Sequence, residues 1–165
     1  TPLHLAAAQA DVATCEELLR YVSVAVVNSY VQTPLMHLAA SRVKQSFGPI
    51  ISLLHSTLHD RDPQGRTALM FAAHGLGIGS RLGNLVLVKA LVAAGADVCD
   101  TDEHGYSALG WAKKNLNPKK PDANKEVIEW LEQRQYEKEV ERFFRRNYEH
   151  HFDEKGEMHI VSRSR

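Results

Sequence analysis

Nine histidines and two cysteines are the residues of this chain whose side chains could support metal binding or nucleophilic catalysis. His150, His151 and His159 form the densest histidine group, but neither cysteine is near them and they lack the spacing of a fixed metal site. Cys15 falls inside an apolar segment and Cys99 follows a turn, so neither belongs to a metal-binding or redox motif. We interpret Cys15 as a small buried hydrophobe, both cysteines as free thiols, and the three histidines as solvent-facing residues.

A glycine-rich segment, residues 75–83, invites comparison with phosphate-binding loops. Its sequence, GLGIGSRLG, contains no Lys-Ser or Lys-Thr pair, and no predicted strand precedes it. No local motif marks a serine–histidine–aspartate order, an activated cysteine or a carboxylate pair. We therefore predict no catalytic residue, no cofactor and no bound metal, and we interpret the segment as a loop inserted between two helices.

The charge balance limits the classes of partner. Lys plus Arg and Asp plus Glu both number 20, which gives a formal net charge of zero and argues against a dedicated nucleic-acid-binding protein. No apolar run approaches the ~20 residues of a membrane-spanning helix, and no signal-peptide pattern opens the sequence. With free cysteines typical of a reducing compartment, we expect an intracellular protein, cytoplasmic or nuclear, without nucleic-acid or membrane partners.

The elements that would position any site are clearest in residues 62–101. A turn at 62–65 is followed by a first predicted helix, TALMFAAH, in which the Thr67 hydroxyl is expected to cap the first turn. A second helix is predicted over residues 83–94, where Leu87, Val88, Leu91 and Val92 form one apolar stripe. Gly95 suits a left-handed helix stop. Such a unit cannot bury its own apolar face, so it must stack on copies of itself.

The same pattern recurs along the chain. TPLHLAA begins at Thr1, TPLMHLAAS at Thr33, TALMFAAH at Thr67 and SALGWAKK at Ser107, each followed by a second helical segment. This pattern resembles the ankyrin repeat. The resemblance implies an all-α solenoid of stacked helix pairs with short turns, comprising about four repeats at residues 1–28, 29–61, 62–101 and 102–131. It is followed by a C-terminal helix over 132–152 and a tail over 153–165 that is either flexible or a small hairpin.

The second repeat departs most from this pattern. Its turn has Val31 where the later turns have glycine, and a valine does not easily take a positive φ. We therefore expect this turn to be distorted, which affects the placement of Tyr30. In the TPLH motif of the first repeat, the resemblance implies that His4 forms hydrogen bonds with neighbouring backbone.

The C-terminal segment, residues 133–152, contains no glycine or proline and is predicted to continue the last helix. It carries an apolar stripe that contains Tyr136, Val140, Phe144, Tyr148 and Phe152, with Phe143 beside it. Three roles remain open: folding back to cap the last repeat, a dimer contact, or a docking helix for a partner. Because terminal repeats require a cap, we expect capping, and a monomer rather than a dimer. Trp111 and Trp130 are expected to contribute to this end of the core.

The resemblance implies a non-catalytic scaffold that binds a partner protein through its turn tips and the concave face of its first helices. Carried onto this chain, the candidate partner-binding residues are Tyr30, Gln32, Arg42, Gln64, Arg66, His74, Glu103, His104, Tyr106 and Lys114. Tyr30 and Tyr106 lead this set because tyrosine is enriched in binding hot spots.

Two other functions remain open. The chain starts abruptly at Thr1, inside a repeat, so we expect it to be part of a longer protein. It could then be the regulatory or substrate-recruiting domain of an enzyme whose catalytic part lies elsewhere. Alternatively, it is a structural unit that self-associates through the C-terminal helix.

Overall fold

The computed structural model describes residues 1–41, 47–75, 83–114, 124–152 and 158–162. In these residues the chain forms four helix pairs followed by a β-hairpin. The first helices of the pairs are α1 (Pro2–Ala8), α3 (Pro34–Ala39), α5 (Ala68–His74) and α7 (Ala108–Lys114). The second helices are α2 (Val12–Leu18), α4 (Gly48–Leu53), α6 (Leu85–Ala93) and α8 (Lys125–Asn147). A short 3-10 helix, η1 (His55–Thr57), follows α4.

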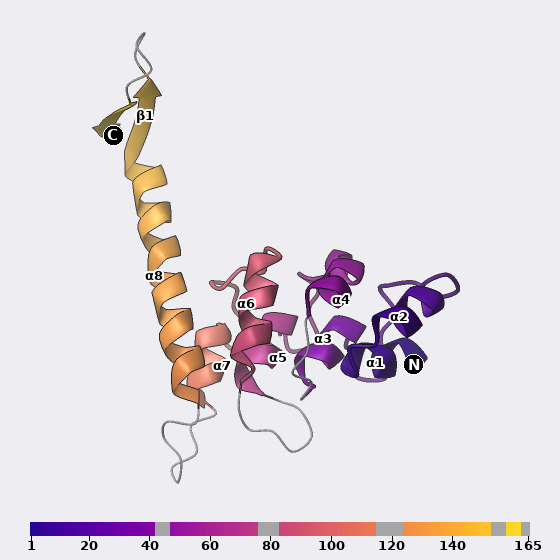
Figure 1. Ribbon diagram of the computed structural model, residues 1–165. Coiled ribbons are helices and arrows are strands. Elements are labelled where there is room, and N and C mark those ends of the chain that lie inside the picture. The colour runs from indigo at the N-terminus through magenta and orange to yellow at the C-terminus, as the bar shows by residue number, and fades with distance from the viewer. Residues whose placement is uncertain (42–46, 76–82, 115–123, 153–157, 163–165) are drawn as a thin grey trace.

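The helix pairs stack side by side in sequence order (Figure 1). The first helices α1, α3, α5 and α7 are neighbours in one layer, and the second helices cover them from one side. One continuous core runs between the layers and includes Leu35, Leu69, Leu87 and Leu131. Alanines such as Ala72 let the two layers approach closely. The predicted all-α solenoid of stacked helix pairs is confirmed.

The helix starts follow the predicted signals with two corrections. The Thr33 hydroxyl accepts a hydrogen bond from the Met36 backbone N–H, as expected for an N-cap. Thr67 also occupies an N-cap position, but its side chain makes no capping hydrogen bond, so that part of the prediction was wrong. Helix α6 begins at Leu85 rather than at residue 83, because Asn84 caps it by accepting a hydrogen bond from the Leu87 N–H.

Three turns that precede first helices have the same hydrogen-bonding pattern. Asn28, Asp62 and Asp102 each donate a backbone N–H to the carbonyl oxygen four residues later, over 3.0–3.1 Å. Their side-chain Oδ1 atoms accept the N–H groups two and four residues ahead. The fourth residue of each turn has a positive φ, 57° at Val31, 76° at Gly65 and 78° at Gly105. The prediction that Val31 distorts its turn was therefore wrong: the turn keeps its shape, and the valine adopts the left-handed conformation.

Replacing Val31 by glycine is expected to stabilise the fold by about 1 kcal/mol, because a left-handed conformation costs a residue with a Cβ about 1–2 kcal/mol and glycine loses part of this gain to backbone entropy. Val31 is exposed, so no core contact is lost. Val27→Gly is the matched control, since Val27 is similarly exposed and has a negative φ. Urea denaturation should show Val31→Gly more stable and Val27→Gly less stable than the parent. Loss of stability in both would contradict the strain argument.

Helix α8 runs without interruption from Lys125 to Asn147 and extends beyond the helix stack (Figure 1). The helix predicted over residues 133–152 ends at Asn147, five residues earlier than predicted. The chain continues as β1 (Tyr148–Phe152), which pairs antiparallel with β2 (Met158–Ser162) so that Tyr148 lies opposite Ser162. Of the two forms expected for the tail, the hairpin is the one present.

The aromatic stripe of α8 faces away from the repeats. Val127 and Leu131 are buried against the stack, and Lys138 and Arg142 lie on the same side of the helix, where both contact the Asp97 carboxylate beyond α6. At about 100° per residue, Tyr136, Val140 and Phe143 lie on the opposite side. Helix α8 does cap the last repeat, but through its Val127–Leu131 row. The aromatic stripe that was expected to do so is out of phase with that row and does not pack on the repeats.

Candidate functional site

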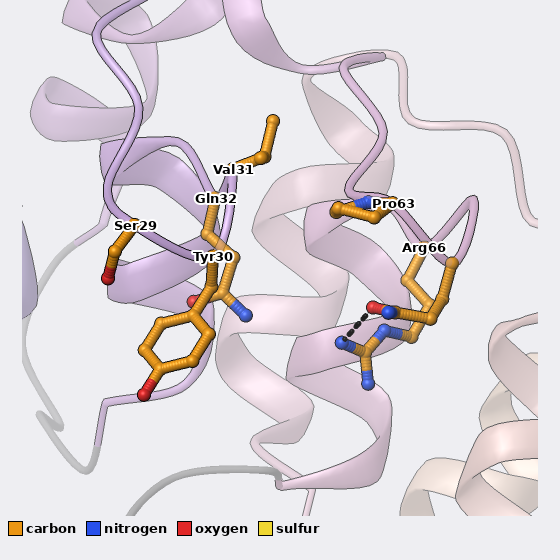
Figure 2. Close-up of a pocket in the computed structure, with 7 residues that line it drawn as sticks. Ser29, Tyr30, Val31, Gln32, Pro63 and Arg66 are labelled. Atoms are coloured by element: carbon orange, nitrogen blue, oxygen red, sulfur yellow. Dashed lines mark hydrogen bonds between the residues drawn. The ribbon is translucent and has the colours of Figure 1, made fainter.

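A pocket of about 490 Å³ lies between the tips of the turns at residues 28–32 and 62–66 (Figure 2). Its lining consists of Ser29, Tyr30, Val31 and Gln32 from one turn and Pro63, Gln64 and Arg66 from the next. The shared hydrogen-bonding pattern of the turns fixes the backbone on both sides. The pocket therefore has a preformed wall at each side, with the exposed Tyr30 ring at one and the Arg66 guanidinium at the other.

Arg66 connects this pocket to the surface of the first helices. Its Nε and Nη2 atoms donate to Asp62 Oδ2 over 2.8 and 2.6 Å, and Nη2 also donates to Gln64 Oε1. The guanidinium carbon lies 4.7 Å from the Phe71 ring centroid and 5.7 Å from that of Trp111. Because Asp62 is buried and fully paired, it holds the guanidinium in one place.

Trp111 is the centre of a second cluster, on α7. Its ring has His74 at 4.9 Å in an edge-on arrangement and Tyr106 at 6.0 Å, and the Lys114 ammonium lies 4.6 Å from its centroid. Lys114 also lies 4.7 Å from the Tyr106 ring centroid. Aromatic faces attract cations at such distances. The Lys114 ammonium thus lies against two aromatic rings, beside the turns at residues 62–66 and 102–106.

The Asp102 side chain holds Tyr106 and Trp111 of this cluster in place through hydrogen bonds. Its Oδ1 accepts the His104 and Tyr106 N–H groups, and its Oδ2 accepts the Trp111 indole N–H over 2.9 Å. Burial alone would raise the pKa of this carboxyl, but the three hydrogen bonds outweigh burial and lower its pKa below the ordinary value. Asp102 therefore stays ionised and positions Tyr106 and Trp111 together.

The structure brings together most of the predicted partner-binding residues. One group lines the pocket: Tyr30, Gln32, Gln64 and Arg66. A second group surrounds Trp111: Arg66, His74, Tyr106 and Lys114. Glu103 and His104 are exposed at the tip of the turn at residues 102–106, with the Glu103 N–H donating to the Gln64 carbonyl oxygen. Arg42 lies outside the described residues.

Phe71 and Trp111 are buried directly beneath this surface, and sequence reasoning did not assign them a role in it. Each is the fourth residue after a helix-starting Thr67 or Ser107, and His37 has the same place after Thr33. Aligning the repeats at these helix starts would have placed the three side chains in one column.

His4 and Cys15 are buried and have structural roles, whereas the side chains of His150, His151 and His159 lie outside the described part of the structure. His4 Nε2 lies 2.7 Å from the Gln32 carbonyl oxygen, which confirms the predicted backbone contact. Burial is the main cause that lowers the pKa of His4, His37 and His74, so all three favour the neutral form. Cys15 is buried, and desolvation, followed by the nearby Asp11 charge, raises its pKa to about 11. Within the described part of the chain, no group of three or more His, Cys, Asp or Glu residues is placed to hold a metal ion.

Comparison with known proteins agrees with this architecture. The family model of the ankyrin repeat matches residues 1–29 and 64–103. No curated protein matches the chain. Among the described residues, no helix combines the length and apolarity needed to cross a membrane. The matched segments contain the α1–α2 and α5–α6 pairs, so the chain contains ankyrin repeats.

Proposed function

We propose that the chain is a non-catalytic scaffold that binds a partner protein through its turn tips and the adjoining surface of its first helices. Ankyrin repeats are generally protein–protein interaction modules. The observation that carries the proposal is the continuity of the two clusters through Arg66. This one side chain lines the pocket at Tyr30 and also lies against Phe71 and Trp111.

The chemistry of this surface suits a protein ligand. Tyrosine and arginine are among the residue types that dominate binding hot spots. Both occur here, over the buried Trp111, on a backbone fixed by hydrogen bonds. Rigid anchors lose little conformational entropy on binding. Tyr30 is 72% exposed and Tyr106 is 40% exposed, so both are available for contact.

Affinity capture from cell extract, followed by titration of the captured partner, tests this proposal. The double variant Tyr30→Ala, Tyr106→Ala is expected to weaken binding more than about thirtyfold, as loss of hot-spot residues does. Tyr21→Ala is the matched control, because Tyr21 is 78% exposed and follows α2 in the second-helix layer. Circular dichroism should show all variants folded. A partner that binds the double variant as tightly as the parent would overturn the proposal.

A further inference from the structure

We propose that α8 forms an antiparallel pair with α8 of a second copy of this chain, burying its aromatic stripe. This interface is separate from the proposed partner-binding surface, which lies on the turns and first helices. The expectation of a monomer depended on the stripe capping the last repeat. Since the stripe faces away from the repeats, the reason for that expectation is removed.

The stripe is exposed along the part of α8 that extends beyond the stack. Tyr136 is 65%, Phe143 56% and Phe144 44% exposed, and Val140 lies between them. The Phe143 and Phe144 rings contact each other and Tyr148, which holds them as one cluster at the end of the helix. Contiguous exposed apolar surface of this kind marks an interaction site.

One row of α8 has the spacing of a two-helix seam and includes Tyr136, Val140 and Phe143 of the stripe. Together with the polar residues at its ends, Gln133 and Asn147, these residues follow one another at alternating steps of three and four. This is the spacing at which two helices pack side by side around a shared apolar line. With a two-fold axis between Val140 and Phe143, each Val140 lies opposite Phe143 of the second copy, and each Tyr136 lies opposite Asn147.

The charges at the edge of this seam favour a second copy in the antiparallel direction. In this register, Glu139 of each copy lies beside Arg146 of the other, which makes two symmetric ion pairs. Other charged residues in this part of α8 already have partners: Arg134 with Glu137, Arg145 with Glu141, and both Lys138 and Arg142 with Asp97. Glu139 Oε1 accepts a hydrogen bond from Gln135 Nε2 over 3.2 Å, and neither Glu139 nor Arg146 forms an ion pair within the described residues. Charges that flank a helix seam set its orientation and partner.

Sedimentation velocity at rising protein concentration tests the dimer. The parent should approach twice the mass of the chain, whereas Phe143→Ser, which removes an exposed ring without touching the core, should remain a monomer. Glu139→Arg and Arg146→Glu should each weaken the dimer about tenfold by placing like charges together. Arg145→Glu is the matched control: Arg145 is the neighbouring residue, lies away from the stripe, and should leave the dimer unchanged.

A mixture of the two charge variants tests the antiparallel register. Glu139→Arg and Arg146→Glu together restore an attractive pair at both positions, so their equimolar mixture should form a heterodimer. The double variant carrying both substitutions should likewise dimerise with itself. A parent that stays monomeric at every concentration overturns the proposal. A dimer that is insensitive to Phe143→Ser would contradict the aromatic stripe as the interface. Charge variants that fail to form a heterodimer when mixed would contradict the antiparallel register.

Discussion

Asn124→Ala is expected to lower the free energy of unfolding by about 4 kcal/mol. Two buried carbonyl groups and one partly buried N–H would lose their partner, and each such loss costs about 1–3 kcal/mol. The Asn124 side chain is buried at the start of α8. Its Oδ1 accepts the Gly83 N–H, and its Nδ2 donates to the carbonyl oxygens of Ala73 and Ala112.

The position of these carbonyls explains the size of the effect. Ala73 and Ala112 lie in the last turns of α5 and α7, where carbonyl oxygens have no partner within their own helix. One side chain thus closes the ends of two neighbouring first helices and ties both to the second-helix layer. Gly83 must remain glycine beside it, because a Cβ there would lie 2.4 Å from the Ala73 oxygen.

Urea denaturation followed by circular dichroism measures this prediction. Asn84→Ala is the matched control, since Asn84 caps α6 by accepting the Leu87 N–H, and removal of an N-cap costs about 1 kcal/mol. Asn124→Asp should be no milder than Asn124→Ala, because a carboxylate would face two carbonyl oxygens. A loss for Asn124→Ala equal to that for Asn84→Ala would contradict the role assigned to Asn124.

The repeat architecture was predictable because its signals are local. Helix-starting Thr33 and Thr67, the turn at residues 62–65 and the stop at Gly95 each act within a few residues of themselves. The stacking follows, since a helix pair with one apolar face has to bury it on the next pair.

The predictions that the structure corrects depend on how residues interact with one another, which the local signal at a single position does not show. The turn at Val31 keeps its shape because Asn28 accepts two backbone N–H groups, and these hydrogen bonds offset the strain of one residue. The stripe of α8 is apolar in sequence, yet the repeats bury the row of α8 that contains Leu131 instead. The two rows lie on opposite sides of the helix, so only one of them can pack against the repeats.

Sequence analysis predicted the turn residues of the candidate site better than it predicted the role of Trp111. Tyr30, Gln64 and Tyr106 could be placed from the turn positions of the repeat. Trp111 was expected to contribute to the core at this end of the chain, and it is buried there. The sequence did not indicate that it also supports the candidate binding surface. Its role becomes visible only when Arg66, from the preceding repeat, is found 5.7 Å from its ring centroid.

Asp102→Ala is expected to cost about 3 kcal/mol of unfolding free energy and to disrupt the surface around Trp111. The substitution leaves the Trp111 indole N–H and two turn N–H groups without their acceptor, and hydrogen bonds to a charged group contribute about 1.5–3 kcal/mol each. The exposed N–H groups of the turn recover hydrogen bonds with water. The indole N–H, bonded to Asp102 in a buried position, accounts for most of the loss.

A double-mutant cycle with Trp111→Phe isolates that contribution. Asp102→Ala should cost less in the Trp111→Phe background, because phenylalanine has no N–H to leave unpaired. The tryptophan fluorescence of Asp102→Ala should also shift, since the ring loses its anchor, and partner binding should weaken with it because Tyr106 depends on the same carboxylate. Equal losses in both backgrounds would show that Asp102 acts on its own turn alone. The surface around Trp111 would then be held by its ring contacts rather than by the turn beneath it.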